Sequence, residues 1–386
     1  MRKLAILGAT GSIGTQTLDL VRLDSNIKVV AISFGQNLEL AKKIIEEFKP
    51  ELVSAQLEKD KDELCKLYPN IKFVFGKQGL NEVATTSLAD AVVNALVGSI
   101  GLEPTYLAIK HHKDIYLANK ETLVIGGSLI MDEAKKNKVK IYPLDSEHSA
   151  IFQLLDHQDE TQISRLIITA SGGSLRDLSK DELEFVTKEQ VLNHPNWQMG
   201  DKITVDSATM MNKGFEIIEA HHLFNVEIDK IEVLIHKSSI VHSMVEFNDG
   251  SICAQMASPD MHLPIHYAIY HKTHSKCDII KKLPLEKIYN LTFEPLDNKR
   301  YPLVELTKKV AIKGGIYPCI LNACNEVAVE LFLKGIIKFN EIEKIIVEEL
   351  NNHYYDNYLD EPLSIELLLK VDSLVKNKVK KERMGE

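Results

Sequence analysis

KLAILGATGSIG, residues 3–14, is the stretch of sequence that decides the fold. Lys3–Leu7 is a short apolar run that predicts a buried strand, and Thr15–Arg22 has the apolar spacing of a helix. The glycines at positions 8, 11 and 14 let the backbone approach a pyrophosphate, whose charge the helix N-terminus favours. The motif therefore predicts a dinucleotide site, and a tight turn without a ligand is the alternative.

Short strand-like runs alternate with amphipathic stretches through the first 145 residues. Such alternation requires crossover connections and predicts a Rossmann-like α/β fold, a doubly wound parallel sheet covered on both faces. The predicted strands are Lys3–Leu7, Val29–Ser33, Ile71–Val74, Ala91–Val97, Ile115–Ala118 and Ile141–Pro143. The predicted helices are Thr15–Arg22, Leu38–Phe48, Leu102–Lys110 and Glu121–Lys136.

The pattern changes after residue 145. Four further strand-like runs follow, and Asn248-Asp249-Gly250 between the last two is a hairpin signal, so this part is predicted to be α+β with an antiparallel component. These runs are Arg165–Ala170, Glu232–Ile235, Ile240–Glu246 and Ser251–Gln255. Residues 277–298 are weakly periodic and suit a linker. Four helical stretches then predict a C-terminal bundle: Val304–Ile312, Ile320–Lys334, Asn340–Asn351 and Ile365–Lys376.

The composition excludes several classes of function. The 386 residues contain 46 Lys and Arg against 55 Asp and Glu, a net charge of −9, which argues against a general nucleic-acid or membrane-surface binder. The five cysteines are odd in number and form no C-x-x-C pair, so a disulfide framework is not expected. Because Gly8 interrupts the first apolar run, we interpret it as a strand, not a signal peptide, and predict a cytoplasmic protein.

The end of the second predicted strand favours NADP over NAD. An NAD site usually places a carboxylate there to bind the ribose 2′-hydroxyl. Here the strand ends in Ser33-Phe34-Gly35-Gln36-Asn37, which contains no acid. A 2′-phosphate would not be repelled, and the polar side chains of this segment could donate hydrogen bonds to it.

Carboxylates follow another predicted strand. Asp145 and Glu147 come directly after Ile141–Pro143, and Asp-x-Glu in extended chain places both side chains on one face. A divalent cation between them would relieve their repulsion, and oxygen ligands favour Mg²⁺ or Mn²⁺ over zinc. A solvated acidic turn is the alternative. Glu216 offers a third carboxylate, four residues after Asn212, but spacing does not tell whether it meets Asp145.

Two basic features are also candidates. Lys120 follows the strand Ile115–Ala118 and could face an anionic ligand at the same sheet edge, although a surface lysine before a helix is common. His262 and His266 are four residues apart, but Pro264 lies between them and no H-E-x-x-H pattern is present. We therefore interpret the two histidines as a surface or interdomain feature and not as a zinc pair.

The segment Leu175–Gly200 is polar, weakly periodic and longer than most connections, which is typical of an active-site lid. It contains the only tryptophan, Trp197, next to the stiffening Pro195. We predict that the Trp197 ring closes over the substrate and excludes water. The alternative is a tryptophan packed permanently in the core.

Taken together, these motifs resemble the 1-deoxy-D-xylulose 5-phosphate reductoisomerase family over essentially the whole chain. The similarity runs through Leu7–Gly14, Ala118–Glu121, Pro143–Gln153, Ala170–Gly173, His194–Gly200, Asp206–Ala220, Ile240–Val245 and Asn325–Val329. The glycine loop is shared by many dehydrogenases, whereas PLDSEH, HPNWQMG and MMNKG in this order are highly specific.

The resemblance implies an architecture and a reaction. It implies an NADPH-binding domain at 1–145, a catalytic domain at 146–276 with its lid loop at 175–200, a linker at 277–298 and a helical domain at 299–386. It implies a homodimer that rearranges 1-deoxy-D-xylulose 5-phosphate and reduces it with NADPH to 2-C-methyl-D-erythritol 4-phosphate, in the non-mevalonate route to isoprenoid precursors. A divalent ion would assist, Mg²⁺ or Mn²⁺, with Co²⁺ as a further candidate.

The resemblance also implies roles for individual residues. The metal ligands would be Asp145, Glu147 and Glu216. The substrate contacts would be Lys120, Ser146, Ser171, His194, Ser207, Asn212 and Lys213. The NADPH contacts would be Thr10, Gly11, Ser12, Ile13, Gly35, Gln36, Asn37, Asn119, Glu121 and Gly200.

Three positions depart from the family pattern. Gln36 stands where a lysine is frequent, which predicts weaker NADPH binding, while Lys237 replaces a usual proline and His262 a common arginine. Two other functions remain open from the residues: a metal-assisted NADP dehydrogenase without rearrangement, and a non-catalytic NADPH sensor. The three carboxylates argue against the sensor, which needs no metal ligands.

Overall fold

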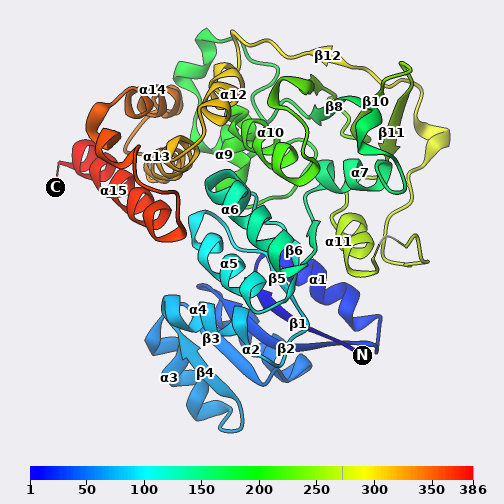
Figure 1. The fold of residues 1–386 in the computed structure, drawn as a ribbon, viewed down its shortest axis with the longest axis vertical. Coiled ribbons are helices and arrows are strands. Elements are labelled where there is room, and N and C mark those ends of the chain that lie inside the picture. The colour runs from blue at the N-terminus through cyan, green and yellow to red at the C-terminus, as the bar shows by residue number, and fades with distance from the viewer. Residues whose placement is uncertain (272, 386) are drawn as a thin grey trace. The chain divides into compact units, whose positions relative to one another are not determined.

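A computed structural model describes residues 1–271 and 273–385, and it divides into two compact units (Figure 1). Unit 1 comprises Met1–Thr122, Ile130–Ser149 and Asp260–Ile280, and unit 2 comprises Leu123–Leu129, Ala150–Pro259 and Lys281–Glu386. Residues 260–276 thus group with the N-terminal unit. The division into four parts by role stays a prediction.

Unit 1 is built on a seven-stranded parallel sheet of order β4-β3-β2-β1-β5-β6-β7. The strands are β1 (Arg2–Leu7), β2 (Ile27–Phe34), β3 (Leu52–Ala55), β4 (Lys72–Phe75), β5 (Ala91–Asn94), β6 (Asp114–Leu117) and β7 (Ile141–Pro143). The chain moves outward from β1 to β4 and then returns to the other side of β1 at β5. In open α/β sheets, ligands bind at the strand ends beside such a switch point.

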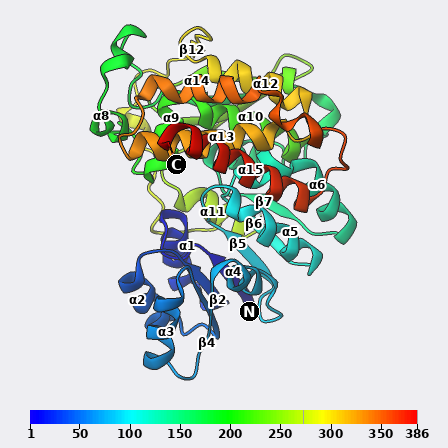
Figure 2. The same ribbon diagram turned by 90° about the vertical axis from the view of Figure 1, so that its left-hand side faces the viewer.

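Helices cover both faces of this sheet, as the alternation predicts. Right-handed crossovers place α1–α3 on one face and the helices after β4 on the other, and Figure 2 shows α1, α2 and α3 on one side of the strands and α4 and α5 on the other. The helices are α1 (Ser12–Arg22), α2 (Leu38–Phe48), α3 (Glu58–Leu67), α4 (Gly76–Thr85), α5 (Leu102–Lys110), α6 (Glu121–Asn137) and α11 (His262–Ile269). The boundary between the units falls within α6 and α7 (Ser146–Leu154).

Unit 2 contains a five-stranded mixed sheet of order β11-β10-β8-β9-β12. Its strands are β8 (Ile163–Ala170), β9 (Ile231–Ile235), β10 (Val241–Phe247), β11 (Ile252–Met256) and β12 (Glu294–Pro295). The predicted antiparallel component is confirmed, because β10 pairs antiparallel with both β8 and β11, and the Asp249-Gly250 turn joins β10 to β11. β12, in the expected linker, pairs with β9.

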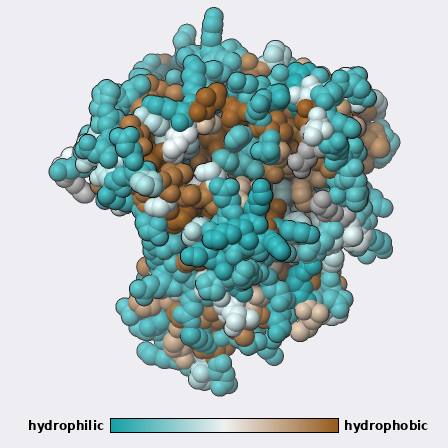
Figure 3. Space-filling view, in the orientation of Figure 1, coloured by the Kyte–Doolittle hydropathy of each residue, from teal (hydrophilic) through white to brown (hydrophobic). Residues whose placement is uncertain are grey.

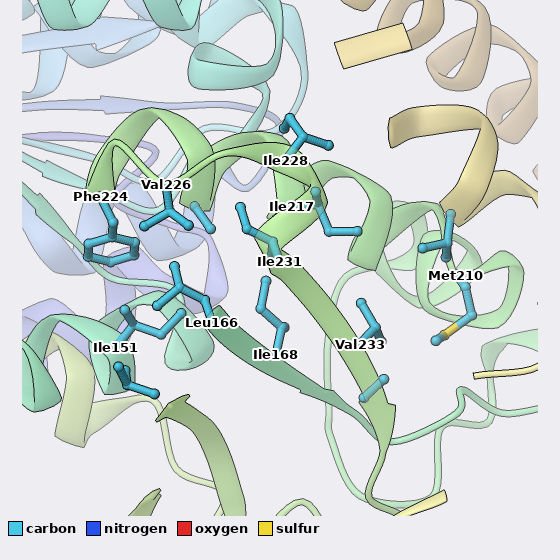
Figure 4. Packing of buried hydrophobic residues seen from close by; sticks show 14 of the residues in the cluster. Ile151, Leu166, Ile168, Met210, Ile217, Phe224, Val226, Ile228, Ile231 and Val233 are labelled. Atoms are coloured by element: carbon cyan, nitrogen blue, oxygen red, sulfur yellow. The ribbon is translucent and has the colours of Figure 1, made fainter. Parts of the chain in front are cut away.

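The helices of unit 2 are α8 (Lys188–Leu192), α9 (Asp201–Thr209), α10 (Met211–Phe224), α12 (Pro302–Lys313), α13 (Tyr317–Leu333), α14 (Phe339–Leu350) and α15 (Ile365–Met384). The last four confirm the predicted C-terminal bundle, and α13 packs against both α14 and α15. Figure 4 shows the core between α10 and the sheet, where Ile217 and Phe224 lie near Leu166 and Ile231. This packing fixes α10, which carries several predicted site residues.

The face in Figure 3 is mainly hydrophilic, with hydrophobic residues gathered in patches. Among the residues that the structure describes, no helix combines the length and the apolar character needed to cross a bilayer. All five cysteines are free, as the sequence predicts.

Candidate active site

The glycine loop lies where β1 ends, beside the switch point between β1 and β5. Gly8 has a φ of +84°, and a Cβ there would lie 2.7 Å from the carbonyl oxygen of Ala95, the residue that follows β5. A Cβ on Gly14 would lie 2.3 Å from the carbonyl oxygen of Gly8, so α1 packs directly on the loop. Close packing of this kind brings the N-terminus of α1 to the strand end, as a dinucleotide site requires.

The end of β2 supports the glycine loop and lacks a carboxylate. The amide of Gly8 donates to the Ser33 hydroxyl oxygen at 3.0 Å, so the buried Ser33 side chain holds the loop. Asn37 caps α2, because its side-chain oxygen accepts from the Leu40 amide at 3.1 Å. Gln36 is exposed next to it. Of the polar side chains in this segment, Gln36 is therefore the one most available to a 2′-phosphate.

Asn119, predicted to contact NADPH, is buried and its side chain holds the loop that follows β5. Its amide nitrogen donates to the carbonyl oxygens of Leu96 and Gly98 and to Glu121, at 3.0–3.1 Å. Its side-chain oxygen accepts from the amide and hydroxyl of Thr122. The Asn119 side chain thus shapes the loop after β5, and any contact it makes with a cofactor would come from its backbone.

Lys120 and two carboxylates come together in unit 1 where β6 and β7 end. The Lys120 ammonium lies 2.5 Å from Asp145, and both side chains are nearly buried. Asp145 and Glu147 each place a carboxylate oxygen within 4.8 Å of the other. Ser146 donates to Glu147 at 2.5 Å. Two hard oxygen donors this close suit a divalent cation, and Lys120 offsets part of their charge.

Glu216, the third predicted metal ligand, lies on α10 in unit 2. It is fully buried and accepts from the Asn212 amide at 2.5 Å and from the Lys213 ammonium at 2.7 Å. These partners precede Glu216 by four and three residues, so one helix face carries all three groups, as the spacing predicts. The Lys213 ammonium offsets the cost of burying a carboxylate charge, and a metal ligand must carry that charge.

Ser171, which precedes the predicted lid, contacts His194, which lies inside it. The Ser171 hydroxyl lies 3.0 Å from Nε2 of His194, and Nδ1 of His194 accepts from the amides of Asn196 and Trp197. Because Nδ1 accepts, Nε2 carries the proton and donates to Ser171. The Ser171 oxygen also accepts from the amide of Gly173, at 3.2 Å. Because the Ser171 oxygen accepts both bonds, the hydroxyl keeps its own proton to donate.

His194 is expected to stay neutral through the physiological range. Burial, with the positive charges of Arg176 and Lys213, lowers the pKa of His194 to about 4. The unfolded chain takes up this proton near pH 6.5, so the folded state loses stability as pH falls from about 6.5 to about 4 and gains none above that window. Proton-detected NMR of the His194 imidazole will give the midpoint of its titration. A midpoint near pH 6.5 would contradict the lowered pKa of His194.

Ser207 lies on α9 next to the segment that follows β8, and Trp197 lies in the predicted lid near His242. A Cβ on Gly173, whose φ is +75°, would lie 2.6 Å from the Ser207 carbonyl oxygen, so α9 packs against the segment that follows β8. Gly200 begins α9, with no atom near its absent side chain. The Trp197 ring is half-buried, 6.2 Å from the His242 ring. The closure of Trp197 over a ligand stays a prediction.

Sequence reasoning missed one polar group beside these residues, Arg176. Arg176 donates to the carbonyl oxygens of Ser171 and Lys237, and it brings positive charge toward His194. The His262 ring contacts Asp260 and Asp19, whereas the His266 ring contacts Ser275. Arg176 follows Ser171 by five residues, and no recognised motif marks it.

The fold and the side chains described above define a class of enzyme. Unit 1 has a doubly wound sheet with a glycine loop at its switch point and an acidic pair at a neighbouring strand end. Unit 2 presents a carboxylate together with hydroxyl, amide and ammonium donors. This combination is that of a dinucleotide-dependent oxidoreductase with an oxygen-ligand metal site and an anionic substrate.

Comparisons with known proteins identify the family. Family models of 1-deoxy-D-xylulose 5-phosphate reductoisomerase match residues 4–127, and models of its C-terminal domains match 141–224 and 256–378. Reductoisomerases of Bacillus anthracis and Macrococcus caseolyticus are each 49% identical, with coverage of 97–99% of both chains. The chain belongs to the 1-deoxy-D-xylulose 5-phosphate reductoisomerase family.

Solved structures agree with this assignment. A DOX-P reductoisomerase in complex with NADPH, fosmidomycin and magnesium superposes with a TM-score of 0.94 at 35% identity, covering 100% of this chain and 98% of that one. The enzyme of Zymomonas mobilis in complex with NADPH gives 0.89 at 36% identity, covering 99% of both. The expected α/β fold is therefore confirmed.

Proposed function

We propose that this chain converts 1-deoxy-D-xylulose 5-phosphate into 2-C-methyl-D-erythritol 4-phosphate, with NADPH and a divalent metal ion. The reaction is an isomerisation of the carbon skeleton followed by a reduction, and it belongs to the non-mevalonate route to isoprenoid precursors. The observation that carries this function is the 49% identity to named reductoisomerases over 97% of both chains.

The residues of unit 1 fit NADPH. Gly8 and Gly14 allow the loop to pack closely against the strand end and α1, because a Cβ at either position would collide with backbone atoms, and this packing brings the N-terminus of α1 to the expected pyrophosphate position. We assign the cofactor contacts to the loop Thr10–Ile13, to Gly35–Asn37, to Asn119 and Glu121, and to Gly200. When bound, NADPH supplies the hydride that reduces the rearranged aldehyde.

The carboxylates fit a divalent cation of the Mg²⁺ or Mn²⁺ type. Asp145 and Glu147 supply two oxygens within 4.8 Å of each other, and we assign the third ligand to Glu216 of unit 2. A bound cation polarises the substrate carbonyl as a Lewis acid. Lys120 and Lys213 offset part of the charge of these carboxylates, and Ser146 orients Glu147.

The donors of unit 2 suit the phosphate of the substrate. The Ser171 hydroxyl oxygen accepts two hydrogen bonds and keeps its own proton to donate, and Ser207, Asn212 and Lys213 lie on the two consecutive helices α9 and α10. Charged hydrogen bonds to phosphate are strong and directional. Binding the phosphate end orients the reacting end of the sugar.

One experiment separates this function from its rivals. NMR of the product formed from 1-deoxy-D-xylulose 5-phosphate, NADPH and Mg²⁺ should show the branched 2-C-methyl skeleton. A straight-chain reduced sugar phosphate would indicate a simple dehydrogenase, and unchanged substrate with bound NADPH would indicate a sensor. Either result would overturn the proposal.

NADPH is expected to be preferred strongly over NADH, because the segment after β2 contains no carboxylate to bind a free ribose hydroxyl. Gln36 provides no cation for the 2′-phosphate. Gln36→Lys should therefore tighten NADPH binding by about 1.5- to 5-fold, the value of one exposed charge pair, and leave NADH unchanged. Equal kcat/KM for the two cofactors in the unaltered protein would contradict this account.

Two finer points belong to the proposal. The expected homodimer is supported by β11, an edge strand whose Ile252 and Met256 are 51% and 38% exposed, because such an edge can pair with a second copy.

The expected cytoplasmic location is supported by five cysteines that remain free, which suits a reducing compartment.

A further inference from the structure

Two buried residues that have no assigned role in the proposed reaction, Asn325 and Asp206, meet inside unit 2. Asn325 lies on α13, fully buried, and its side-chain nitrogen donates to Oδ1 of Asp206 at 2.8 Å. Asp206 lies on α9 and is 2% exposed. Because a carboxylate only accepts, the Asn325 nitrogen, and not its oxygen, must face Asp206.

The second oxygen of Asp206 is also bonded. Lys202, four residues earlier on α9, donates to Oδ2 at 2.8 Å and supplies the counter-charge. Since Lys202 belongs to the same helix, this ion pair cannot fix α9 relative to other elements. The Asn325 bond does, because it joins α9 to α13 across 119 residues of sequence.

The helix held in this way carries predicted substrate contacts. Ser207 follows Asp206 directly, and its carbonyl oxygen lies against Gly173, which follows Ser171 by two residues. After α9, Met210 adopts a left-handed backbone with a φ of +63° and leads straight into α10, which carries Asn212 and Lys213. The placement of α9 therefore sets the position of donors on both helices.

We propose that Asn325 is a positioning residue that, through Asp206, holds α9 so that Ser207 and its neighbours meet the phosphate of the substrate. This inference rests on the proposed function. Asn325 touches no substrate itself. Through this bond, the C-terminal helix α13 influences the affinity for the substrate, in addition to packing against the other helices.

The test compares two buried asparagines of α13 in the full-length protein. Asn325→Leu removes the bond to Asp206, whereas Asn322→Leu removes a bond to Glu326, which lies on α13 itself. Loss of a hydrogen bond to a charged group should raise KM for 1-deoxy-D-xylulose 5-phosphate about 10- to 100-fold in Asn325→Leu. KM for NADPH should stay unchanged in both variants, and Asn322→Leu should keep the KM for the sugar phosphate.

A merely structural role for Asn325 would lower the active fraction, and hence the apparent kcat, without changing KM. Asp206→Leu, which removes both acceptor oxygens, gives a second route to the same KM measurement if Asn325→Leu does not fold. The exchange Asp206→Asn with Asn325→Asp keeps a donor and an acceptor across the two helices and should retain most of the affinity that Asn325→Leu loses.

The unaltered protein is measured first. If it consumes NADPH with the sugar phosphate and Asn325→Leu keeps the same KM, the positioning role is overturned while the proposed function stands. If the exchanged pair binds the sugar phosphate no better than Asn325→Leu, the hydrogen bond between positions 325 and 206 is not the cause and the proposal fails. If the unaltered protein is inactive, the proposed function fails, and the positioning role fails with it.

Discussion

Replacing Glu216 by glutamine is expected to lower metal-dependent turnover by about 100-fold or more, the rate equivalent of several kcal/mol of lost charge stabilisation. Glu216 is fully buried and accepts hydrogen bonds on both carboxylate oxygens, from Asn212 and Lys213. Glutamine has one acceptor oxygen, so one donor loses its partner and the metal loses a charged ligand. NADPH affinity should survive, because the glycine loop belongs to unit 1.

The measurement is a steady-state titration with Mg²⁺, together with NADPH binding followed by fluorescence. Glu227→Gln is the matched control, because this exposed glutamate lies just beyond α10 and pairs with Lys230 on the surface. The control should behave as the unaltered protein. Near-normal turnover of Glu216→Gln at low Mg²⁺ would remove Glu216 from the metal site.

Gly14→Ala is expected to abolish tight NADPH binding and to destabilise the protein by about 1–3 kcal/mol, the usual cost of overpacking. The added Cβ would lie 2.3 Å from the Gly8 carbonyl oxygen and 2.7 Å from the Ala9 Cα. Both are backbone atoms of the loop, so neither can rotate away. The helix must shift, and its N-terminus then leaves the pyrophosphate position.

Gly11→Ala is the comparison variant. Its added Cβ would lie 3.3 Å from the Gly8 carbonyl oxygen, and the φ of Gly11 is not positive, so an alanine there causes no backbone strain. It should cost less than about 1 kcal/mol, as a tolerated core change does. Urea unfolding and NADPH fluorescence measure both variants. If Gly14→Ala binds NADPH as tightly as the unaltered protein, close packing of α1 on the loop is not what forms the site.

Strong periodicity made most of the fold predictable, and its absence explains the elements that were missed. β1, α2, α5 and α12–α14 show clear apolar patterns and fall within a few residues of their predicted bounds, whereas α15 continues eight residues beyond its predicted end at Lys376. α3 was not predicted because its sequence, EKDKDELCKL, buries only Asp60 and Leu64. β3 has four residues and α4 starts with a glycine, so neither gave a pattern long enough to recognise.

The site was predictable only where its residues are close in sequence. The spacing of Asn212 and Glu216 places them on one helix face, and the structure confirms this contact. Lys120 and Asp145 are 25 residues apart, and Ser171 and His194 are 23 apart, so their contacts depend on the fold. No local pattern in the sequence signals the Asn325–Asp206 bond, which the packing of α13 on α9 creates.

The most direct test of the account is the absorbance of NADPH in the presence of this protein and 1-deoxy-D-xylulose 5-phosphate. NADPH should be consumed when Mg²⁺ or Mn²⁺ is present, and consumption should stop when a chelator removes the metal or when the sugar phosphate is omitted. Consumption that continues at the same rate without a divalent metal, or no consumption in the complete mixture, would contradict the account.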